Sequence, residues 1–357
     1  IMNISKKIKL AILKNEDPFD HLPWVRACDQ YEGEIDYQVI DLTAGSWMEK
    51  ICTYCPDILL LKPSGKTSLF RKLYQERLEI LTNELGYPSF PGLDEVRIYE
   101  NKRFFAYWAK ANNVPHPETR VFYHEKEALA ALESLGLPLV GKINIGASGN
   151  GIRVLRTKYD AQKYVSSAFH QGLAARTGPK LGKGKLAYRV WQKIIHPDQL
   201  LNRLKTYRQI ATDRQTGFVI LQQFIPHQYE WRAVRIGDSF FAHKKMALSG
   251  KASGSLIKQY DNPPAGLLDF IHCLTDRFGF KSVAVDIFEP KPEQYLVNEI
   301  QCIFGQSDPY QMLVDEKPGR YVLGDRGWIF QEGNFNTNES YDLRLETAIA
   351  LYQTGNN

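Results

Sequence analysis

Short apolar runs alternate with amphipathic stretches over the first hundred residues. The runs have the length and composition of buried strands, and the stretches between them repeat apolar residues at helical spacing. Strands are expected at 9–13, 37–40 and 58–61, and helices at 21–31, 47–54 and 69–85. This β-α-β-α-β order predicts a small open parallel sheet. Residues 86–92, which contain Pro88 and Pro91, interrupt the pattern and mark a domain boundary.

The pattern changes in the later part of the chain, where strands follow one another with few helices between them. Helices are expected at 101–113, 125–135, 160–169, 267–278 and 341–353. Strands are expected at 119–123, 218–225, 230–236, 239–246, 282–288 and 295–302, with a hairpin across 138–157. Loops are expected at 249–255 and 333–340. Strands joined by short turns pair antiparallel. This part is therefore predicted to be α+β, in contrast to the α/β beginning.

The composition is that of a globular protein with more than one domain. The chain has 357 residues, of which 43% are hydrophobic and 24% charged, and this length exceeds a usual single core. Its apolar runs are much shorter than a membrane-spanning helix, and polar residues follow the first of them too soon for a signal peptide. Five cysteines in a chain this long do not indicate a disulfide framework. This cysteine usage favours a reducing cytoplasm.

Positive charge is concentrated between residues 171 and 215. Ten basic residues stand there against two acidic ones, while the net charge of the whole chain is only +5. Such a segment either attracts an anionic substrate or is a solvated surface excursion without a partner. Dedicated nucleic-acid binding is disfavoured, because aromatic residues are not interleaved with the basic ones.

Residues 138–157 contain the pattern that points most directly to chemistry. An apolar run carries Lys142 near its end, a loop of small residues follows at 146–151, and a second β-rich run begins at Ile152. Backbone N–H groups in a glycine-rich loop can approach phosphate oxygens closely, and a lysine beside the loop adds a mobile positive charge. The order predicts a strand–loop–strand flap over a nucleotide. The alternative is a glycine-rich turn with a surface lysine.

Two other short motifs are not expected to form a P-loop or a zinc site, although the first, a loop at the carboxyl end of a strand, could still contact substrate. The segment Gly65-Lys66-Thr67 lacks the earlier glycine of a P-loop, since Leu60 stands at that position. Cys52 and Cys55 form a single C-x-x-C without a second pair or a nearby histidine cluster, so no zinc site is expected.

Carboxylates recur on the strands near the end of the α+β part. Asp286 lies in the apolar run SVAVDIF, where a carboxylate is costly to bury unless it is paired or bound to a metal. Glu299 and Gln301 stand two residues apart on the next strand, so both face one side. If the two strands pair, three oxygen-bearing side chains converge, as Mg²⁺ requires. A buried ion pair of Asp286 with a core lysine or arginine is the alternative.

A second polar group precedes these carboxylates. Glu230 and Arg232 share one strand face directly after the apolar strand that ends at Pro226, and Lys245 lies on the following strand. The apolar strand before Pro226 can accept an adenine through backbone hydrogen bonds, and the carboxylate of Glu230 can bind ribose hydroxyls. The two cations, Arg232 and Lys245, can contact a phosphoryl group. A salt bridge between Arg232 and Glu230 is the competing explanation.

The features described so far occur in a particular order along the chain: a lysine, a flap lysine with a glycine loop, a hinge strand, an acid-x-Arg motif, a cationic strand, an Asp and a Glu-x-Gln motif. In this order they resemble the ATP-grasp superfamily, and within it the RimK-like ligases. The resemblance covers roughly residues 95–305. It implies a pre-ATP-grasp α/β domain at 1–95, an ATP-grasp lid subdomain at 96–225 with the basic insertion 171–215, and a C-terminal ATP-grasp subdomain with the Mg²⁺ site at 226–357, with ATP between the two subdomains.

The resemblance also implies roles for individual positions. For the nucleotide, these are phosphate contacts by Lys102 and Lys142, a phosphate flap with Gly146, Ser148, Gly149 and Gly151, an adenine hinge at Gln223, Phe224 and Ile225, and a ribose contact by Glu230. For the metal, the implied Mg²⁺ ligands are Asp286, Glu299 and Gln301. The implied catalytic contacts with the acyl phosphate or substrate are made by Arg232 and Lys245.

Three positions depart from the pattern of the superfamily. Gln222-Gln223 stands where the hinge often begins with Glu, Gln301 stands where the final metal ligand is usually Asn, and Lys245 stands where arginine is frequent. The longer glutamine changes the reach of the last ligand, and a lysine cannot make the bidentate fork of an arginine.

The activity that the resemblance implies is an ADP-forming ligation of a carboxylate to an amine or thiol through an acyl phosphate, with ATP and one or two Mg²⁺ as cofactors. The basic segment suggests an anionic acid, for example one used in tailoring a peptide or surface polysaccharide. A small-molecule kinase on the same fold and a nucleotide-binding regulatory module without turnover stay open as alternatives. The expected partners are small molecules, and the oligomeric state is open, a homodimer included.

Overall fold

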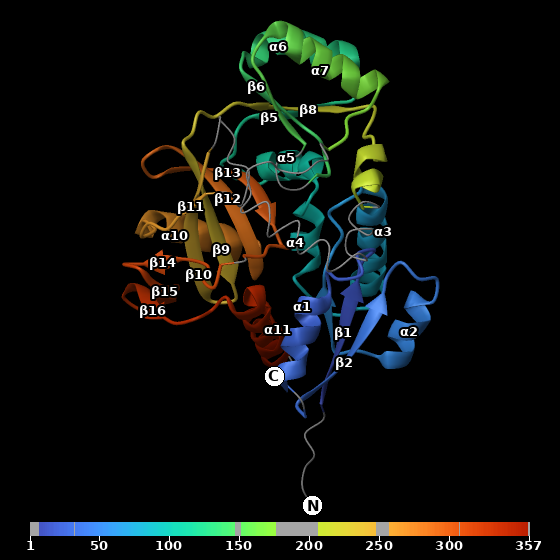
Figure 1. Ribbon diagram of the computed structural model, residues 1–357, viewed down its shortest axis with the longest axis vertical. Helices are drawn as coiled ribbons and strands as arrows, with labels where there is room; N and C mark the ends of the chain where they lie inside the picture. Colours follow the sequence, from blue (N-terminus) through green and yellow to red (C-terminus); the bar gives the residue numbers. More distant parts are fainter. Residues whose placement is uncertain are drawn as a thin grey trace, which may run out of the picture.

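The computed structural model describes residues 7–31, 33–146, 151–175, 206–247, 257–306 and 308–355. Its described strands form three sheets, which we call the N-terminal sheet, the upper sheet and the large sheet. Figure 1 shows the upper sheet at the top of the molecule, the N-terminal sheet at the lower right and the large sheet at the left.

The N-terminal sheet is parallel, as the alternating pattern predicts. Its strands are β1 (Ile8–Lys14), β2 (Ile35–Asp41), β3 (Ile58–Leu61) and β4 (Ser89–Phe90), in the order β2-β1-β3-β4. The connecting helices are α1 (Leu22–Cys28) with the 3-10 turn Asp29–Tyr31, α2 (Trp47–Tyr54), and α3 (Ser68–Glu79) followed by the π-helical turn Ile80–Glu84. The short strand β4 lies inside the expected break and adds an edge to the sheet.

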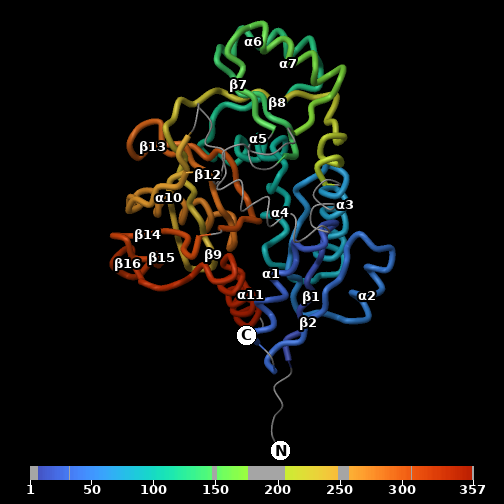
Figure 2. Tube along the Cα trace, in the orientation of Figure 1, coloured from blue at the N-terminus to red at the C-terminus, as the bar shows by residue number. Residues whose placement is uncertain are grey.

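The last helix, α11 (Tyr341–Gly355), returns to this N-terminal part of the molecule and packs beside α1. Both figures of the whole chain show the two helices side by side (Figure 1, Figure 2). The contact is apolar, and the rings of Trp24 and Tyr341 meet edge to face with their centroids 4.8 Å apart. Residues from the far end of the sequence thus complete the core of the N-terminal sheet.

The upper sheet is antiparallel and small. It contains β5 (Thr119–Phe122), β6 (Leu139–Lys142), β7 (Ile152–Leu155) and β8 (Val219–Gln223), in the order β5-β8-β6-β7. Helices α6 (Glu125–Leu135) and α7 (Lys158–His170) lie over its outer face (Figure 1). The expected strand–loop–strand hairpin is present as the antiparallel pair β6 and β7.

The large sheet contains the remaining described strands. They are β9 (Tyr229–Ile236), β10 (Ser239–Met246), β11 (Lys258–Gln259), β12 (Ser282–Lys291), β13 (Gln294–Gln301), β14 (Leu313–Val314), β15 (Lys317–Gly324) and β16 (Gly327–Glu332). Helices α4 (Leu93–Ile98), α5 (Lys102–Ala111) and α10 (Ala265–Arg277) contribute to its main core. The strands β11 and β14 to β16, the helix α4 and the 3-10 turn Thr337–Ser340 were not predicted from the sequence. In the described part of the chain, no helix is both long and apolar enough to cross a membrane.

Candidate active site

Cross-strand pairing in the large sheet brings the predicted charged residues together. Asp286 on β12 is the register partner of Arg232 on β9 and of Glu299 on β13, and Lys245 on β10 is the partner of Glu230 on β9. Side chains that lie opposite one another on neighbouring strands stand on the same face and close together. The central strands of this sheet therefore collect five charged residues from four different strands.

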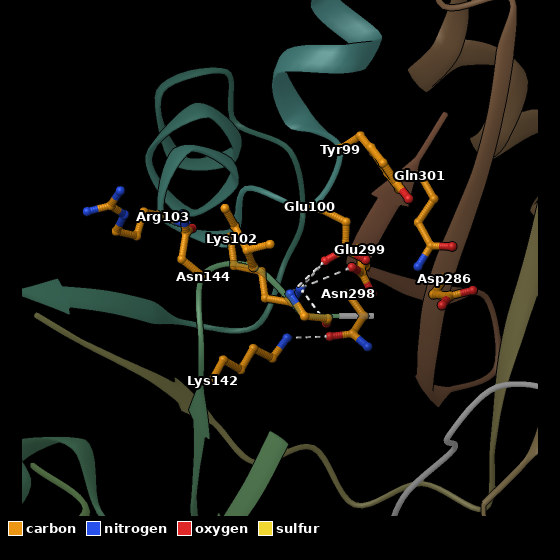
Figure 3. A network of polar contacts seen from close by, with 12 residues as sticks. Tyr99, Glu100, Lys102, Arg103, Lys142, Asn144, Asp286, Asn298, Glu299 and Gln301 are labelled. Atoms are coloured by element: carbon orange, nitrogen blue, oxygen red, sulfur yellow. Dashed lines mark hydrogen bonds and ion pairs between the residues drawn. The ribbon is translucent and has the colours of Figure 1, made fainter. Parts of the chain in front are cut away.

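Asp286 is buried and makes ion pairs with two cations. Arg232 donates Nε to Oδ1 at 2.9 Å and Nη2 to Oδ2 at 3.1 Å, and Lys245 Nζ lies 2.6 Å from Oδ2. Gln301 accepts a hydrogen bond from Arg232 Nη2 at 3.3 Å. The ion pair considered as the alternative to a metal site is thus formed, and the convergence of Asp286, Glu299 and Gln301 on one face is also present (Figure 3).

The other predicted salt bridge has a different partner. Lys245, rather than Arg232, meets Glu230, with Nζ 3.0 Å from Oε2. Arg232 reaches across to Asp286 instead, because the two residues are register partners on adjacent strands. Burial alone raises the pKa of Asp286, but Arg232 and Lys245 together outweigh burial and hold this pKa below its usual value. The carboxylate therefore stays ionised.

Lys102 begins helix α5, which Asn101 caps by accepting a hydrogen bond from the backbone N–H of Phe104. The cap fixes the first turn and with it the direction of the lysine. Lys102 Nζ lies 3.1 Å from Glu100 Oε2 and 3.4 Å from Glu299 Oε1, and it donates to the carbonyl of Gly146 at 3.3 Å. Burial lowers the pKa of Lys102, but the two carboxylates more than compensate and raise it above its usual value.

Lys142 approaches the same place from the upper sheet. It ends strand β6, is 6% exposed, and donates from Nζ to Asn298 Oδ1 at 2.9 Å (Figure 3). Burial is the main reason that the pKa of Lys142 is lowered to about 8. Asn298 was not predicted as a site residue. It faces the site because a register shift between Asp286 and Ile287 leaves it as an extra residue on β13, next to Glu299.

The flap begins from a well-anchored segment. Gln215, which the sequence argument missed, is buried and accepts from the backbone N–H groups of Asn144 and Ile145 at 2.8 and 3.1 Å. A Cβ at Gly146 would lie 2.6 Å from the side chain of Ile143, and one at Gly151 would lie 2.2 Å from it, so both positions are crowded. The predicted flap residues Ser148 and Gly149, the expected loop at 249–255 and most of the basic segment lie outside the described residues.

The predicted hinge strand is shorter than expected. Strand β8 ends at Gln223, whose backbone N–H donates to the carbonyl of Glu118 at 2.8 Å, so Phe224 and Ile225 follow the strand. The carbonyl of Ile225 is 2.7 Å from His227 Nδ1. Proline has no N–H for a further ladder bond, and Pro226 follows directly.

Glu230 lies close by at the start of β9 and is 5% exposed. Its Oε1 accepts from Asn298 Nδ2 at 3.2 Å, and its Oε2 meets Lys245. Asn298 thereby links Glu230 to Lys142, which comes from a different sheet.

A pocket opens between α5, the upper sheet and β13. Its lining residues are Ile98, Glu100, Asn101, Lys102, Phe105, Thr119, Lys142, Ile220, Gln222, Asn298, Glu299 and Ile300. The lining combines apolar side chains with two lysines and two carboxylates. An apolar wall beside a few convergent charges is the usual make-up of a small-molecule site.

Comparison with known proteins identifies the fold. No family model and no curated protein matches the chain. Solved structures do match over most of its length. A RimK-domain ATP-grasp protein from Sphaerobacter thermophilus is 16% identical with a TM-score of 0.52, covering 84% of this chain and 93% of that one. The D-alanine–D-alanine ligase from Bacillus anthracis in complex with ATP is 11% identical with a TM-score of 0.52, covering 98% and 99%.

A third match is the N5-carboxyaminoimidazole synthetase from Staphylococcus aureus in complex with ADP, at 11% identity and a TM-score of 0.55, covering 96% of this chain and 78% of that one. The chain therefore has the ATP-grasp fold, as the ordered residues suggested, and mixed α and β layers in the expected classes. At these identities the likeness concerns the fold, and the roles of individual residues must be argued from the site itself.

Proposed function

We propose that this protein is an ATP-dependent ligase that joins a carboxylic acid to an amine, or a thiol, and forms ADP and phosphate. The observation that carries the proposal is the convergence of Lys102 and Lys142, from α5 and from the upper sheet, on neighbouring residues of β13. Two buried lysines aimed at one pocket from different elements suit a polyphosphate held between them. The matching solved structures with ATP and ADP support the same assignment.

The nucleotide would lie along the pocket. Lys102 and Lys142 would contact its phosphates under the flap of Gly146, Ser148, Gly149 and Gly151; Gln223, Phe224 and Ile225 would face the adenine, and Glu230 the ribose. The apolar side chains in the lining of the pocket, Ile220 among them, support the binding of a base. The buried Lys102 and Lys142 support the binding of the phosphates.

The residues beside the lysines fit a magnesium ion in their chemistry. Asp286, Glu299 and Gln301 offer two carboxylates and an amide oxygen on one face of β12 and β13, which are the oxygen ligands that Mg²⁺ prefers. Arg232 and Lys245 hold the Asp286 oxygens, so a metal would share or replace these ion pairs. A bound Mg²⁺ would neutralise charge on the transferred phosphoryl group.

The reaction has two steps. A carboxylate oxygen of the acid attacks the γ-phosphorus of ATP, the bond from that phosphorus to the bridging oxygen breaks, and ADP leaves. The amine nitrogen then attacks the acyl carbon, the carbon–oxygen bond to phosphate breaks, and the amine loses a proton. Arg232 and Lys245 would stabilise the negative charge that develops on the phosphoryl and acyl oxygens. The chain's part is orientation and charge neutralisation, with no covalent bond to a side chain.

One observation favours a second candidate, an ATP-binding regulatory module without turnover. The two cations assigned to catalysis and the carboxylate assigned to the metal satisfy one another in the structure. A site that remained in this state would bind nucleotide without transferring phosphate.

The two candidates, and a kinase on the same fold, are separated by following ATP with ³¹P NMR in the presence of Mg²⁺ and pools of carboxylic acids and amines. A ligase releases ADP and inorganic phosphate only when both an acid and an amine are present. A kinase yields ADP and a new phosphorylated compound that is stable in water. Binding of ATP with no phosphorus signal lost over many hours would contradict the ligase and support the regulatory module.

Lys142→Ala tests the site whether the protein is a ligase, a kinase or a regulatory module, because each of these proposals places a phosphate beside this lysine. Unchanged ATP affinity and unchanged turnover in the variant would overturn the assignment of the flap.

A further inference from the structure

Glu100 is a buried carboxylate to which the proposed function gives no role. It lies between α4 and α5 and is only 2% exposed. Its backbone φ is +48°, in the left-handed region that residues other than glycine seldom adopt. A carboxylate in such surroundings is costly unless strong hydrogen-bond donors meet it. The hydrogen-bond donors that meet Glu100 therefore indicate the role of this residue.

Both partners belong to the phosphate site proposed above. Glu100 Oε2 accepts from Lys102 Nζ at 3.1 Å (Figure 3). It also accepts from the backbone N–H of Gly146, the first flap glycine, at 3.1 Å. The lysine and the flap amide thus converge on a single anionic oxygen. A lysine and a glycine N–H aimed at one point form the arrangement that binds a phosphate oxygen.

We propose that Glu100 is a built-in competitor of the nucleotide, which occupies the phosphate donors while the site is empty and releases them when a phosphate oxygen arrives. This inference rests on the proposed function and adds a residue that sets nucleotide affinity. Glu299 is another anion in the lining of the same pocket, and an entering phosphate would add further negative charge that repels the Glu100 carboxylate.

Competition of this kind has a kinetic consequence. Glu100 recovers its two donors when ADP leaves, which weakens nucleotide binding and accelerates product release. Glu100→Gln keeps the size of the side chain and a neutral acceptor but removes the charge. ATP and ADP are expected to bind at least about tenfold more tightly to this variant, a gain of about 1.4 kcal/mol. If product release limits turnover, KM for ATP and kcat fall together.

A role in merely holding Lys102 and the flap in place predicts the opposite. Loss of the charge would then let the two donors move, nucleotide affinity would fall, and KM would rise. The direction of the change in affinity therefore separates a competitor from a support.

The experiment is isothermal titration calorimetry of Mg²⁺–ADP and of a non-hydrolysable ATP analogue into the full chain. The variants are Glu100→Gln, Glu100→Asp, which keeps the charge but is one methylene shorter, and the control Glu118→Gln. Glu118 is an acid of the same type whose side chain is 55% exposed and pairs with Arg120, and neither residue lines the pocket. Circular dichroism and thermal unfolding check that each variant folds.

Tighter binding to Glu100→Gln, a smaller gain in Glu100→Asp and no change in Glu118→Gln are the expected results. Should Glu100→Gln fail to fold, the gain in Glu100→Asp decides. Equal or weaker binding to the Glu100 variants, with binding to the wild type intact, overturns the competitor and leaves the proposed function standing. Failure of every chain, the wild type included, to bind either nucleotide overturns the proposed function and the competitor with it.

Discussion

Lys142 carries a burial cost that can be measured as folding stability. Its ammonium is 6% exposed, and burial lowers its pKa from the usual 10.5 to about 8. At about 1.4 kcal/mol for each pH unit, that difference corresponds to about 3 kcal/mol of stability lost at pH 7. Lys142→Met removes the buried charge but keeps an unbranched side chain of similar length. It also removes the hydrogen bond to Asn298, at a pH-independent cost of about 1 kcal/mol.

The pH dependence has a definite sign. Between pH 8 and 10.5 the unfolded lysine binds a proton and the folded one does not, so the stability of the wild type rises with pH in that range. The Met variant lacks this contribution. Its advantage over the wild type is therefore greatest at pH 7 and shrinks by about 2 kcal/mol by pH 9.5.

The measurement is urea denaturation of both proteins at half-unit intervals from pH 7 to 9.5. Subtracting one free energy of unfolding from the other cancels the titration of every group that the two proteins share. A difference that stays flat across the range would refute the argument that Lys142 is held with a lowered pKa by burial. The variant is also expected to lose nucleotide binding, since the charge is what the phosphates need.

Three further changes test other parts of the site. Asp286→Ala leaves Arg232 and Lys245 without their shared carboxylate and is expected to cost about 3–5 kcal/mol in urea denaturation; a loss below about 1 kcal/mol would contradict the ion-pair description. Asp213→Ala removes the carboxylate that accepts from the backbone N–H of Ser68 at 2.8 Å at the start of α3, and should lower stability by about 1 kcal/mol and speed proteolysis of the upper sheet. Equal proteolysis rates would refute that contact. EDTA should abolish phosphate release and added Mg²⁺ should restore it, whereas turnover that survives EDTA would exclude a required divalent ion.

The apolar runs were sufficient to predict the strands that lie in the core. Residues 58–61 form β3 with the expected bounds, and all four are buried. Strands β15 and β16 were missed because most of their residues are only partly buried or exposed and because Gly319, Gly324 and Gly327 interrupt them. Helix α4 has six residues, too few for a helical period to appear.

The charged residues of the site could be predicted, but their partners could not. A strand has a period of two, so the sequence shows that Glu230 and Arg232 share a face. It does not show the register that places Asp286 opposite Arg232 and Lys245 opposite Glu230, because these pairs come from separate strands. The bulge that turns Asn298 toward Lys142 likewise depends on how β12 and β13 pair. Glu100 left no pattern in the sequence beyond being an acid near Lys102.

The distribution of contacts within the site indicates what moves when a nucleotide enters. The ion pairs among Arg232, Lys245 and Asp286 lie within the large sheet, and Lys102 meets Glu299 from a helix that packs on the same core. The described contacts of the upper sheet and its flap with this charged cluster are hydrogen bonds, from Lys142 to Asn298, from the backbone N–H of Lys102 to the carbonyl of Asn144, and through Gly146.

Among the described residues, the salt bridges of the upper sheet with its helices α6 and α7 join residues of that unit to one another or to the adjoining Glu118. Displacing the upper sheet therefore separates none of these ion pairs. It breaks the shared hydrogen bonds, at about 1 kcal/mol each when water replaces the partner, and the apolar contact of Ala106 on α5 with Val121, Phe218 and Ile220. The charged cluster in the large sheet therefore remains assembled when the upper sheet and its flap move away from it. Of the hydrogen bonds that join the upper sheet to this cluster, those at Gly146 involve the donors that Glu100 holds, whereas the bond from Lys142 to Asn298 does not.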